Sequence, residues 1–167
     1  MSTVTINTSR FGNIEIDESL ILNFTSPILG FDQLKQFVIL DHADESPFKW
    51  LQSLEMPELA FVITNPQFFG IEYEFELPED ACQKLTLTQA EDALVVNIVN
   101  IPADNPKGMT ANLLGPIVIN QSNRMAMQVI LNETEFSTKT PLIQEESSEE
   151  GKENAEENVV PLNPSSQ

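Results

Sequence analysis

The spacing of apolar residues constrains the fold of this chain more than any other feature of its sequence. In residues 1–143 the apolar residues mostly alternate with polar ones or form short runs, and turn-forming residues separate the runs. Alternation at period two is typical of strands, because successive side chains of a strand point to opposite faces of the sheet. We therefore predict strands at residues 4–6, 14–16, 20–24, 37–40, 48–54, 59–63, 94–101, 117–120 and 125–131.

Helical signals are weak by comparison. Pro78, followed by two acidic residues, predicts one short helix at residues 81–85, because proline suits a first helical turn and carboxylates favour the positive end of the helix dipole. A second helical turn is expected at residues 88–92, with Thr88 as its N-cap. The chain shows no repeat, heptad run or alternation of strands with helices. The pattern therefore predicts a mainly β fold, an antiparallel sandwich or small barrel-like domain with one or two short helices.

The composition changes near residue 144. Residues 144–167 contain seven glutamates, one lysine and few apolar residues. Such a segment buries too little apolar surface to offset the entropy that it would lose on ordering. We therefore predict one β domain at residues 1–143, followed by a disordered acidic tail at residues 144–167.

The charge of the chain restricts its partners. It carries 26 acidic and 8 basic side chains, a formal net charge of −18. Because such a charge repels phosphates and anionic lipids, we expect no direct binding to nucleic acid or to a membrane, and a basic or polar protein partner fits better. Neither a signal-type N-terminus nor an apolar run of about 18 residues is present, so we expect a cytoplasmic protein.

Residue types that carry catalysis or bind metals are few. The single cysteine, Cys82, and the single histidine, His42, allow neither a disulfide nor a zinc site of the usual ligands within one chain. The six glycines form no nucleotide-binding motif, and a triad of Ser46, His42 and an aspartate would place its members unusually close in sequence. We therefore expect no enzymatic activity, no cofactor and no metal, and residues 41–46 are interpreted as a connection between two strands.

Residues 72–77 alternate strictly between glutamate and an apolar or aromatic residue. As a strand, this segment would place Glu72, Glu74 and Glu76 on one face and the ring of Tyr73 on the other. The acidic face is either a solvated surface, which is the commoner case, or a strip that faces a basic protein.

An aromatic pair, Phe68 and Phe69, follows Asn65 closely. Adjacent side chains of an extended chain point in opposite directions, so one of the pair is expected near the surface. Packing in the core is the first interpretation and an anchor for a partner is the second, whereas Trp50 is expected in the core. Together with the acidic strip and the polar loop at residues 100–107, these positions supply the candidate partner-binding residues. They are Asn65, Phe68, Phe69, Glu72, Tyr73, Glu74, Glu76, Asn100 and Asp104.

Seven segments keep a recognisable order along the chain. They are FGNIEID at 11–17, PILGF at 27–31, SPFKWLQS at 46–53, PELAFVI at 57–63, YEFELP at 73–78, TANLLGPIVIN at 110–120 and QVIL at 128–131. Together they resemble the FliW family of bacterial flagellar assembly factors, over residues 3–131. Two positions depart from the family pattern: Gly115 stands where alanine is expected, and Ala126 where a glycine commonly precedes the last strand.

The resemblance implies a barrel-like cytoplasmic protein without catalytic activity, which binds flagellin and also CsrA, a small dimeric RNA-binding repressor of translation. In this scheme accumulated flagellin occupies the protein, and CsrA represses flagellin translation. Once flagellin is exported, the freed protein captures CsrA and lifts the repression. The alternatives are a chaperone that serves flagellin alone and, from another class, a small hydrolase or sugar-binding β protein.

Overall fold

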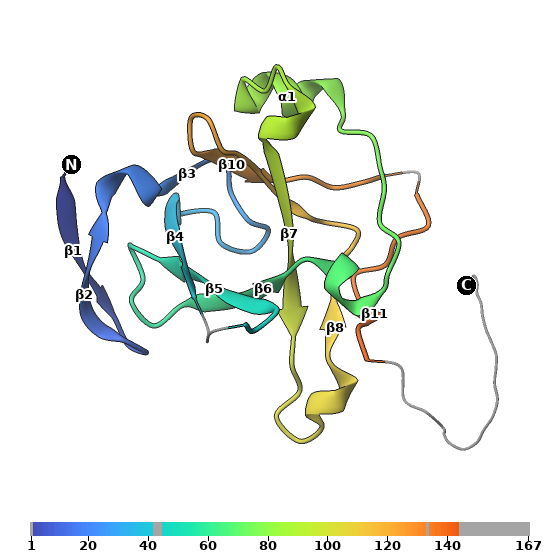
Figure 1. Ribbon diagram of the computed structural model, residues 1–167, viewed down its shortest axis with the longest axis horizontal. Coiled ribbons are helices and arrows are strands. Elements are labelled where there is room, and N and C mark those ends of the chain that lie inside the picture. The colour runs from blue at the N-terminus through green and yellow to red at the C-terminus, as the bar shows by residue number, and fades with distance from the viewer. Residues whose placement is uncertain (1, 42–44, 133, 144–167) are drawn as a thin grey trace.

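The computed structural model describes residues 2–41, 45–132 and 134–143 of the chain. Within them it contains eleven strands, one α-helix and four 3₁₀ helices (Figure 1). The strands are β1 (Thr3–Thr8), β2 (Gly12–Asp17), β3 (Leu22–Ser26), β4 (Gln36–Asp41), β5 (Phe48–Ser53), β6 (Ala60–Thr64), β7 (Ala93–Asn100), β8 (Thr110–Ala111), β9 (Ile117–Asn120), β10 (Met125–Gln128) and β11 (Thr140–Pro141). The helices are η1 (Glu18–Leu20), η2 (Pro66–Phe69), α1 (Glu79–Leu85), η3 (Ala90–Asp92) and η4 (Pro106–Gly108).

Seven of the strands close into a barrel. Backbone pairing runs in the order β7–β6–β5–β4–β3–β10–β9, and β9 pairs in turn with β7. A closed barrel in which every pair is antiparallel needs an even number of strands, because the direction must alternate around the ring. A barrel of seven strands therefore requires a parallel pair, and this pair is β3 with β10. The predicted mainly β, barrel-like fold is confirmed, but the expectation of a purely antiparallel sheet is wrong at this pair.

All nine predicted strands are present, with ends that differ by up to three residues. The prediction missed β8 and β11, which pair with each other and extend the sheet from β7. Each has two residues, too few to show a period in the sequence. The predicted helix is present as α1, whereas Thr88 is not the cap of a second helical turn, since η3 follows Gln89 and has no side-chain cap.

Apolar side chains from every strand of the barrel fill its interior. Phe37 of β4 lies at the centre, fully buried, with its ring 5.0 Å from that of Phe24 and 6.2 Å from that of Phe61. One buried residue from each of the seven strands illustrates the arrangement: Leu22, Phe37, Leu51, Ile63, Val96, Ile117 and Ala126.

The β1–β2 hairpin is a separate two-stranded sheet beside the barrel (Figure 1). Its buried apolar residues, Ile6 and Ile16, pack against Val38 on the outside of β4. Trp50 also lies on the outside and is only half-buried, so the expectation of a core residue is wrong. Its neighbour Leu51 points into the barrel, and alternation therefore directs Trp50 outward, where the Arg10 guanidinium lies 4.0 Å from the centre of its ring.

The tail predicted at residues 144–167 lies outside the described residues, so its disorder stays a prediction. We expect that removing it leaves the thermal midpoint of unfolding nearly unchanged, because its composition offers no core to the domain. Thermal unfolding of residues 1–143 and of the full chain, followed by circular dichroism, measures the difference. A midpoint lowered by more than several degrees would show that the tail packs against the domain.

Candidate functional site

The segment of alternating glutamates is extended but belongs to no sheet. Residues 71–78, here named the strap, connect η2 to α1 across the outer face of the barrel (Figure 1). The strand considered for this segment does not form, because the inward side chains of the strap pack on the face of β7, β9 and β10 and not along an edge. The expected alternation is present, since Glu72, Glu74 and Glu76 are exposed and Tyr73 is buried.

Tyr73 fastens the strap to the barrel. Its hydroxyl donates a hydrogen bond to the Leu113 carbonyl at 2.6 Å and accepts one from Asn97 Nδ2 at 3.1 Å. Its ring packs at 5.1 Å from that of Phe75 and at 4.9 Å from that of Phe136. Only 7% of the residue is exposed, so Tyr73 positions the strap from within and is not placed to contact a partner directly.

Burial raises the pKa of Tyr73 to about 12, while the hydrogen bond from Asn97 acts in the opposite direction. The ordinary pKa of the group is 10.0, so above that pH the unfolded chain loses the proton before the folded chain does. The contribution of the protonated hydroxyl to stability is therefore complete below about pH 10 and falls as the pH rises towards 12. Since the sequence has a single tyrosine, absorbance of the tyrosinate against pH measures this pKa directly.

We expect Tyr73→Phe to lower the free energy of unfolding by about 1–3 kcal/mol at neutral pH, because the buried Leu113 carbonyl loses its donor. The difference between the two proteins should shrink above pH 10, where the wild type loses its own advantage. Urea unfolding at neutral and at alkaline pH tests both statements. An ordinary pKa for Tyr73 in the folded protein would contradict the pH dependence.

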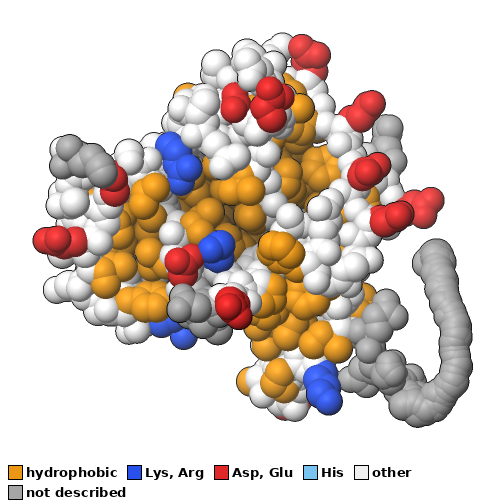
Figure 2. All heavy atoms as spheres, in the orientation of Figure 1, with side chains coloured by type: hydrophobic (Ala, Val, Ile, Leu, Met, Phe, Trp, Pro, Cys, Tyr) orange, Lys and Arg blue, Asp and Glu red, His pale blue; other side chains and the backbone are white. Residues whose placement is uncertain are grey.

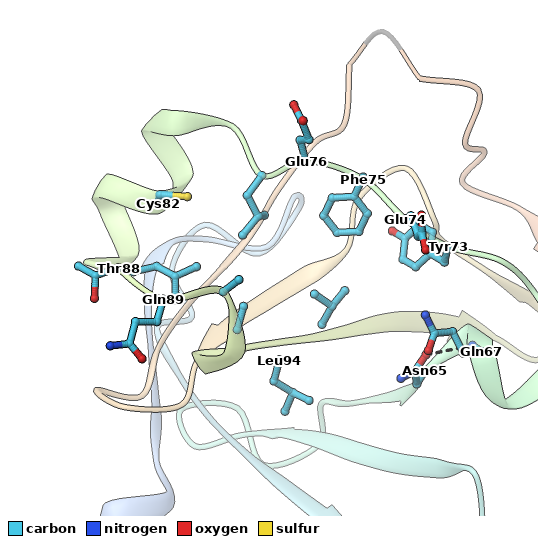
Figure 3. A pocket seen from close by; sticks show the side chains of 15 residues that line it. Asn65, Gln67, Tyr73, Glu74, Phe75, Glu76, Cys82, Thr88, Gln89 and Leu94 are labelled. Carbon is cyan, nitrogen blue, oxygen red and sulfur yellow. Dashed lines mark hydrogen bonds between the residues drawn. The ribbon is translucent and has the colours of Figure 1, made fainter.

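A groove of about 910 Å³ runs between the strap and the first residues of β7 (Figure 3). Ala93, Leu94 and Val95 of β7 line it, and of these Ala93 and Val95 pack with Phe75 and Leu77 of the strap and form the floor. Figure 3 shows the Phe75 ring directed from the strap towards β7, while the Glu76 carboxylate is directed away from it. The groove thus has an apolar floor and an acidic rim.

A second hollow, of about 690 Å³, lies on the other side of the strap, against the end of β10 and residues 129–132. Glu74, Phe75 and Glu76 line both hollows. The strap is therefore a ridge with a hollow on each side, and both sides of it are open to contact.

The aromatic pair lies in η2, whose Gln67 also lines the groove. Phe68 is 68% exposed, whereas Phe69 is partly buried with its ring 5.7 Å from that of Phe48. The expectation that one of the pair lies near the surface is confirmed by Phe68, although it arises in a 3₁₀ helix and not in an extended chain, whereas the first interpretation, packing in the core, is wrong for Phe68. Asn65 caps this helix, since its Oδ1 accepts a hydrogen bond from the Gln67 N–H at 2.9 Å.

Asn100 and Asp104 lie in a different place. β7 begins at the groove with Ala93 and ends at Asn100, and a strand of this length separates its ends by about 23 Å. Both Asn100 and Asp104 are exposed. The structure therefore brings together the candidate residues of the strap and η2, and places the loop after β7 apart from them.

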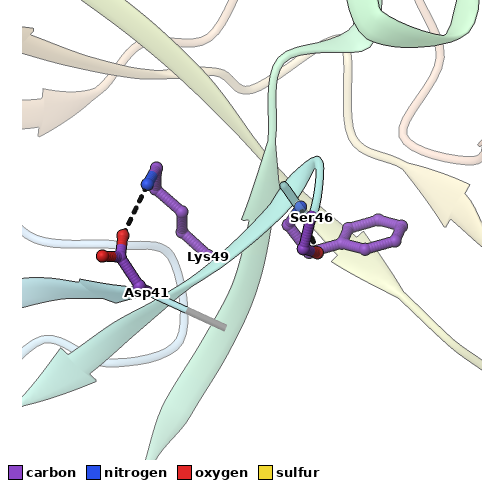
Figure 4. A network of polar contacts seen from close by, with 4 residues as sticks. Asp41, Ser46 and Lys49 are labelled. Carbon is purple, nitrogen blue, oxygen red and sulfur yellow. Dashed lines mark hydrogen bonds and ion pairs between the residues drawn. The ribbon is translucent and has the colours of Figure 1, made fainter. Parts of the chain in front are cut away.

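The described part of the polar connection around residue 46 is held by short-range contacts and by one hydrogen bond from Thr64 Oγ1 to the Pro47 carbonyl at 2.6 Å. Ser46 Oγ accepts a hydrogen bond from the Phe48 N–H at 3.1 Å, and Lys49 pairs with Asp41 at 2.6 Å between exposed side chains (Figure 4). His42, the histidine of the conceivable triad, lies outside the described residues. Within the described ranges, no group of three or more His, Cys, Asp or Glu side chains could hold a metal ion, and no helix is long and apolar enough to cross a membrane.

Sequence reasoning missed the floor of the groove and the buried Asn97 behind it. The walls come from Asn65 and Gln67, from the strap, from Cys82 of α1, from residues 87–90 and from β7, which meet only in the folded chain. One signal was nevertheless present: Pro66 cannot donate a ladder hydrogen bond, so β6 must end before it and leave part of the neighbouring edge of β7 uncovered.

Comparisons with known proteins agree with this architecture. A family model described as FliW protein matches residues 5–142. A flagellar assembly factor FliW of Leptospira biflexa is 39% identical over 142 residues, which are 85% of this chain and 93% of the relative. Another, of Alkaliphilus metalliredigens, is 40% identical over 141 residues, which are 84% of this chain and 86% of the relative. A crystal structure of the flagellar assembly factor FliW superposes with a TM-score of 0.78 at 39% identity, covering 85% of this chain and 99% of the other. Since both the sequence and the barrel match over most of their length, the chain belongs to the FliW family of flagellar assembly factors.

Proposed function

We propose that this protein binds flagellin in the cytoplasm and, when free of flagellin, sequesters the translational repressor CsrA and thereby relieves repression of flagellin translation. It acts by stoichiometric binding and not by catalysis. The observation that carries the proposal is the acidic strap beside an apolar groove, on a chain that belongs to the FliW family.

The charge of the strap supports a basic partner. Glu72, Glu74 and Glu76 are exposed, and the one ion pair among the described residues, Lys49 with Asp41, lies elsewhere. Figure 2 shows acidic side chains along the edge of the molecule that the strap and α1 occupy in Figure 1. Unneutralised carboxylates of this kind accelerate the encounter with a basic RNA-binding protein and keep the chain itself away from RNA.

An exposed aromatic ring supports a protein partner as well. Phe68 is 68% exposed in η2, next to the strap, and large exposed rings frequently contribute most of the energy at interfaces. A partner that covers Phe68 and the strap together would bury an apolar anchor within an acidic rim. This combination suits the binding of a protein better than the binding of a small polar molecule.

The proposed mechanism requires that flagellin and CsrA disfavour each other's binding, by overlap of their sites or by linkage. In a reconstituted mixture, added protein should release CsrA from flagellin mRNA in proportion to its amount, and flagellin should restore the complex of CsrA with RNA. If flagellin weakens the affinity for CsrA about tenfold, CsrA must weaken the affinity for flagellin by the same factor, about 1.4 kcal/mol of coupling.

Pairwise affinities measured by calorimetry, with and without the third protein, test this reciprocity. Binding of flagellin without any binding of CsrA would reduce the function to that of a flagellin chaperone. A ternary complex with unchanged affinities would contradict the switch and leave two independent binding activities.

A further inference from the structure

Part of the edge of β7 has no neighbouring strand. β6 pairs with the second half of β7, and the ladder ends where Thr64 faces Asn97. The next residue of β7 whose backbone N–H and carbonyl are directed towards β6 is Val95. In the register of the ladder it would face Pro66, which has no N–H and begins η2. Pairing with β6 therefore ends at Asn97 and does not reach Val95.

The backbone of Val95 is directed to this open side. The Asp92 carbonyl accepts a hydrogen bond from the Gln121 N–H. Every second residue after Asp92, which means Leu94 and Val96, therefore directs its backbone hydrogen-bonding groups towards β9. Backbone groups alternate along a strand, so those of Val95 point the other way, towards β6. No hydrogen bond to the Val95 N–H or carbonyl is found on that side among the described residues.

The open edge faces the groove. Ala93 and Val95 form its floor on one side, and the strap lies on the other, whereas Leu94 is directed away from the strap (Figure 3). Among the described residues, residues 72–77 of the strap also make no backbone hydrogen bond. A chain placed in the groove would therefore meet unpaired backbone groups, which is the requirement for adding a strand to a sheet.

The chemistry of the walls indicates which chain fits. Phe75, Leu77 and Val95 offer apolar contacts, while the charged side chains that line the groove are Glu74 and Glu76, with no Lys or Arg among the described lining residues. A second copy of this acidic chain would bring like charges to this rim. A strand that alternates apolar and basic residues would place the first on the floor and the second against the carboxylates.

We propose that the groove holds an extended segment of a protein partner, with alternating apolar and Lys or Arg residues, which adds to the open edge of β7 at Val95. The inference rests on the proposed function only for the identity of the partner, because it states how a partner is held. The groove itself can be tested with a peptide and without either flagellin or CsrA.

The probe is an acetylated octapeptide that alternates lysine and valine, titrated into the isotopically labelled full chain and followed by NMR. We expect saturable shifts of the Val95 amide and of the amides of the strap. Two further versions carry N-methyl groups on alternate residues, so that each blocks the hydrogen bonds of one edge of the peptide. One version should bind about tenfold more weakly than the other, because only one edge of the peptide faces β7.

The double variant Glu74→Lys/Glu76→Lys should weaken binding of the probe about tenfold, whereas Glu58→Lys, an exposed charge reversal outside the groove, should leave it unchanged. Equal binding of the two N-methylated versions would overturn strand addition. Binding of the probe without a shift at Val95 would overturn the location, and self-association of the chain that shifts Val95 would make a second copy the occupant. Saturable binding of the probe together with failure to bind flagellin and CsrA would reject the proposed function and retain this inference.

Discussion

Replacing Phe37 by alanine is expected to lower the free energy of unfolding by about 3–5 kcal/mol. The ring is fully buried and packs between those of Phe24 and Phe61 in the centre of the barrel. Its removal costs the transfer free energy of the ring and leaves a cavity, because the seven strands around it are held by a closed ladder and cannot collapse inward. Urea unfolding monitored by circular dichroism measures the loss.

Phe68→Ala is the matched control, since it makes the same chemical change at a ring that is 68% exposed. We expect an effect within about 0.5 kcal/mol there, as for most surface substitutions. Small domains are stable by only about 5–15 kcal/mol, so Phe37→Leu, which retains most of the volume, should be measured as well. Equal effects of alanine at positions 37 and 68 would contradict the placement of Phe37 at the centre of the barrel.

The strands could be predicted from the sequence because each is a local pattern, while the closure of the barrel could not. The parallel pair places Phe24 beside Ala126. The sequence of each strand shows its own alternation of side chains but does not indicate which strand it pairs with. Closure depends on the twist and number of strands in the whole sheet, and such information is not present in any one segment. The same limit explains the choice that the sequence left open between a sandwich and a barrel.

For the candidate site, the sequence predicted which side chains are exposed, but not the buried contacts that hold the segment in place. The alternation of Glu72, Tyr73 and Glu74 correctly predicted which side chains are exposed, because an extended chain alternates whether or not it pairs. One contact that holds the strap on the face of the sheet comes from Asn97, a polar residue in the middle of an apolar run that donates a hydrogen bond to the Tyr73 hydroxyl. A buried polar residue requires a partner, but the sequence does not say which one it finds.

Reversing the charge of Glu72, Glu74 and Glu76 to lysine is expected to slow the association with CsrA, the proposed partner, by on the order of tenfold or more at low ionic strength. The three carboxylates are exposed on one ridge, so a basic partner meets their combined field before any contact forms. Each alone should contribute less than about 1 kcal/mol to the complex, because solvent screens exposed pairs. Stopped-flow association rates at several salt concentrations measure the effect, which should diminish as the screening length shortens.

A second triple variant, with lysine at Glu15, Glu18 and Glu58, separates the strap from the total charge. These three residues are also exposed, but they lie on β2, on η1 and before β6, so both variants change the net charge equally while only one alters the strap. If the overall negative charge alone attracts CsrA, the two variants will slow association to the same extent. A larger effect at the strap, with both variants folded as judged by circular dichroism, is the result that a local docking surface requires, and an unchanged rate there would leave the carboxylates as a solvated face.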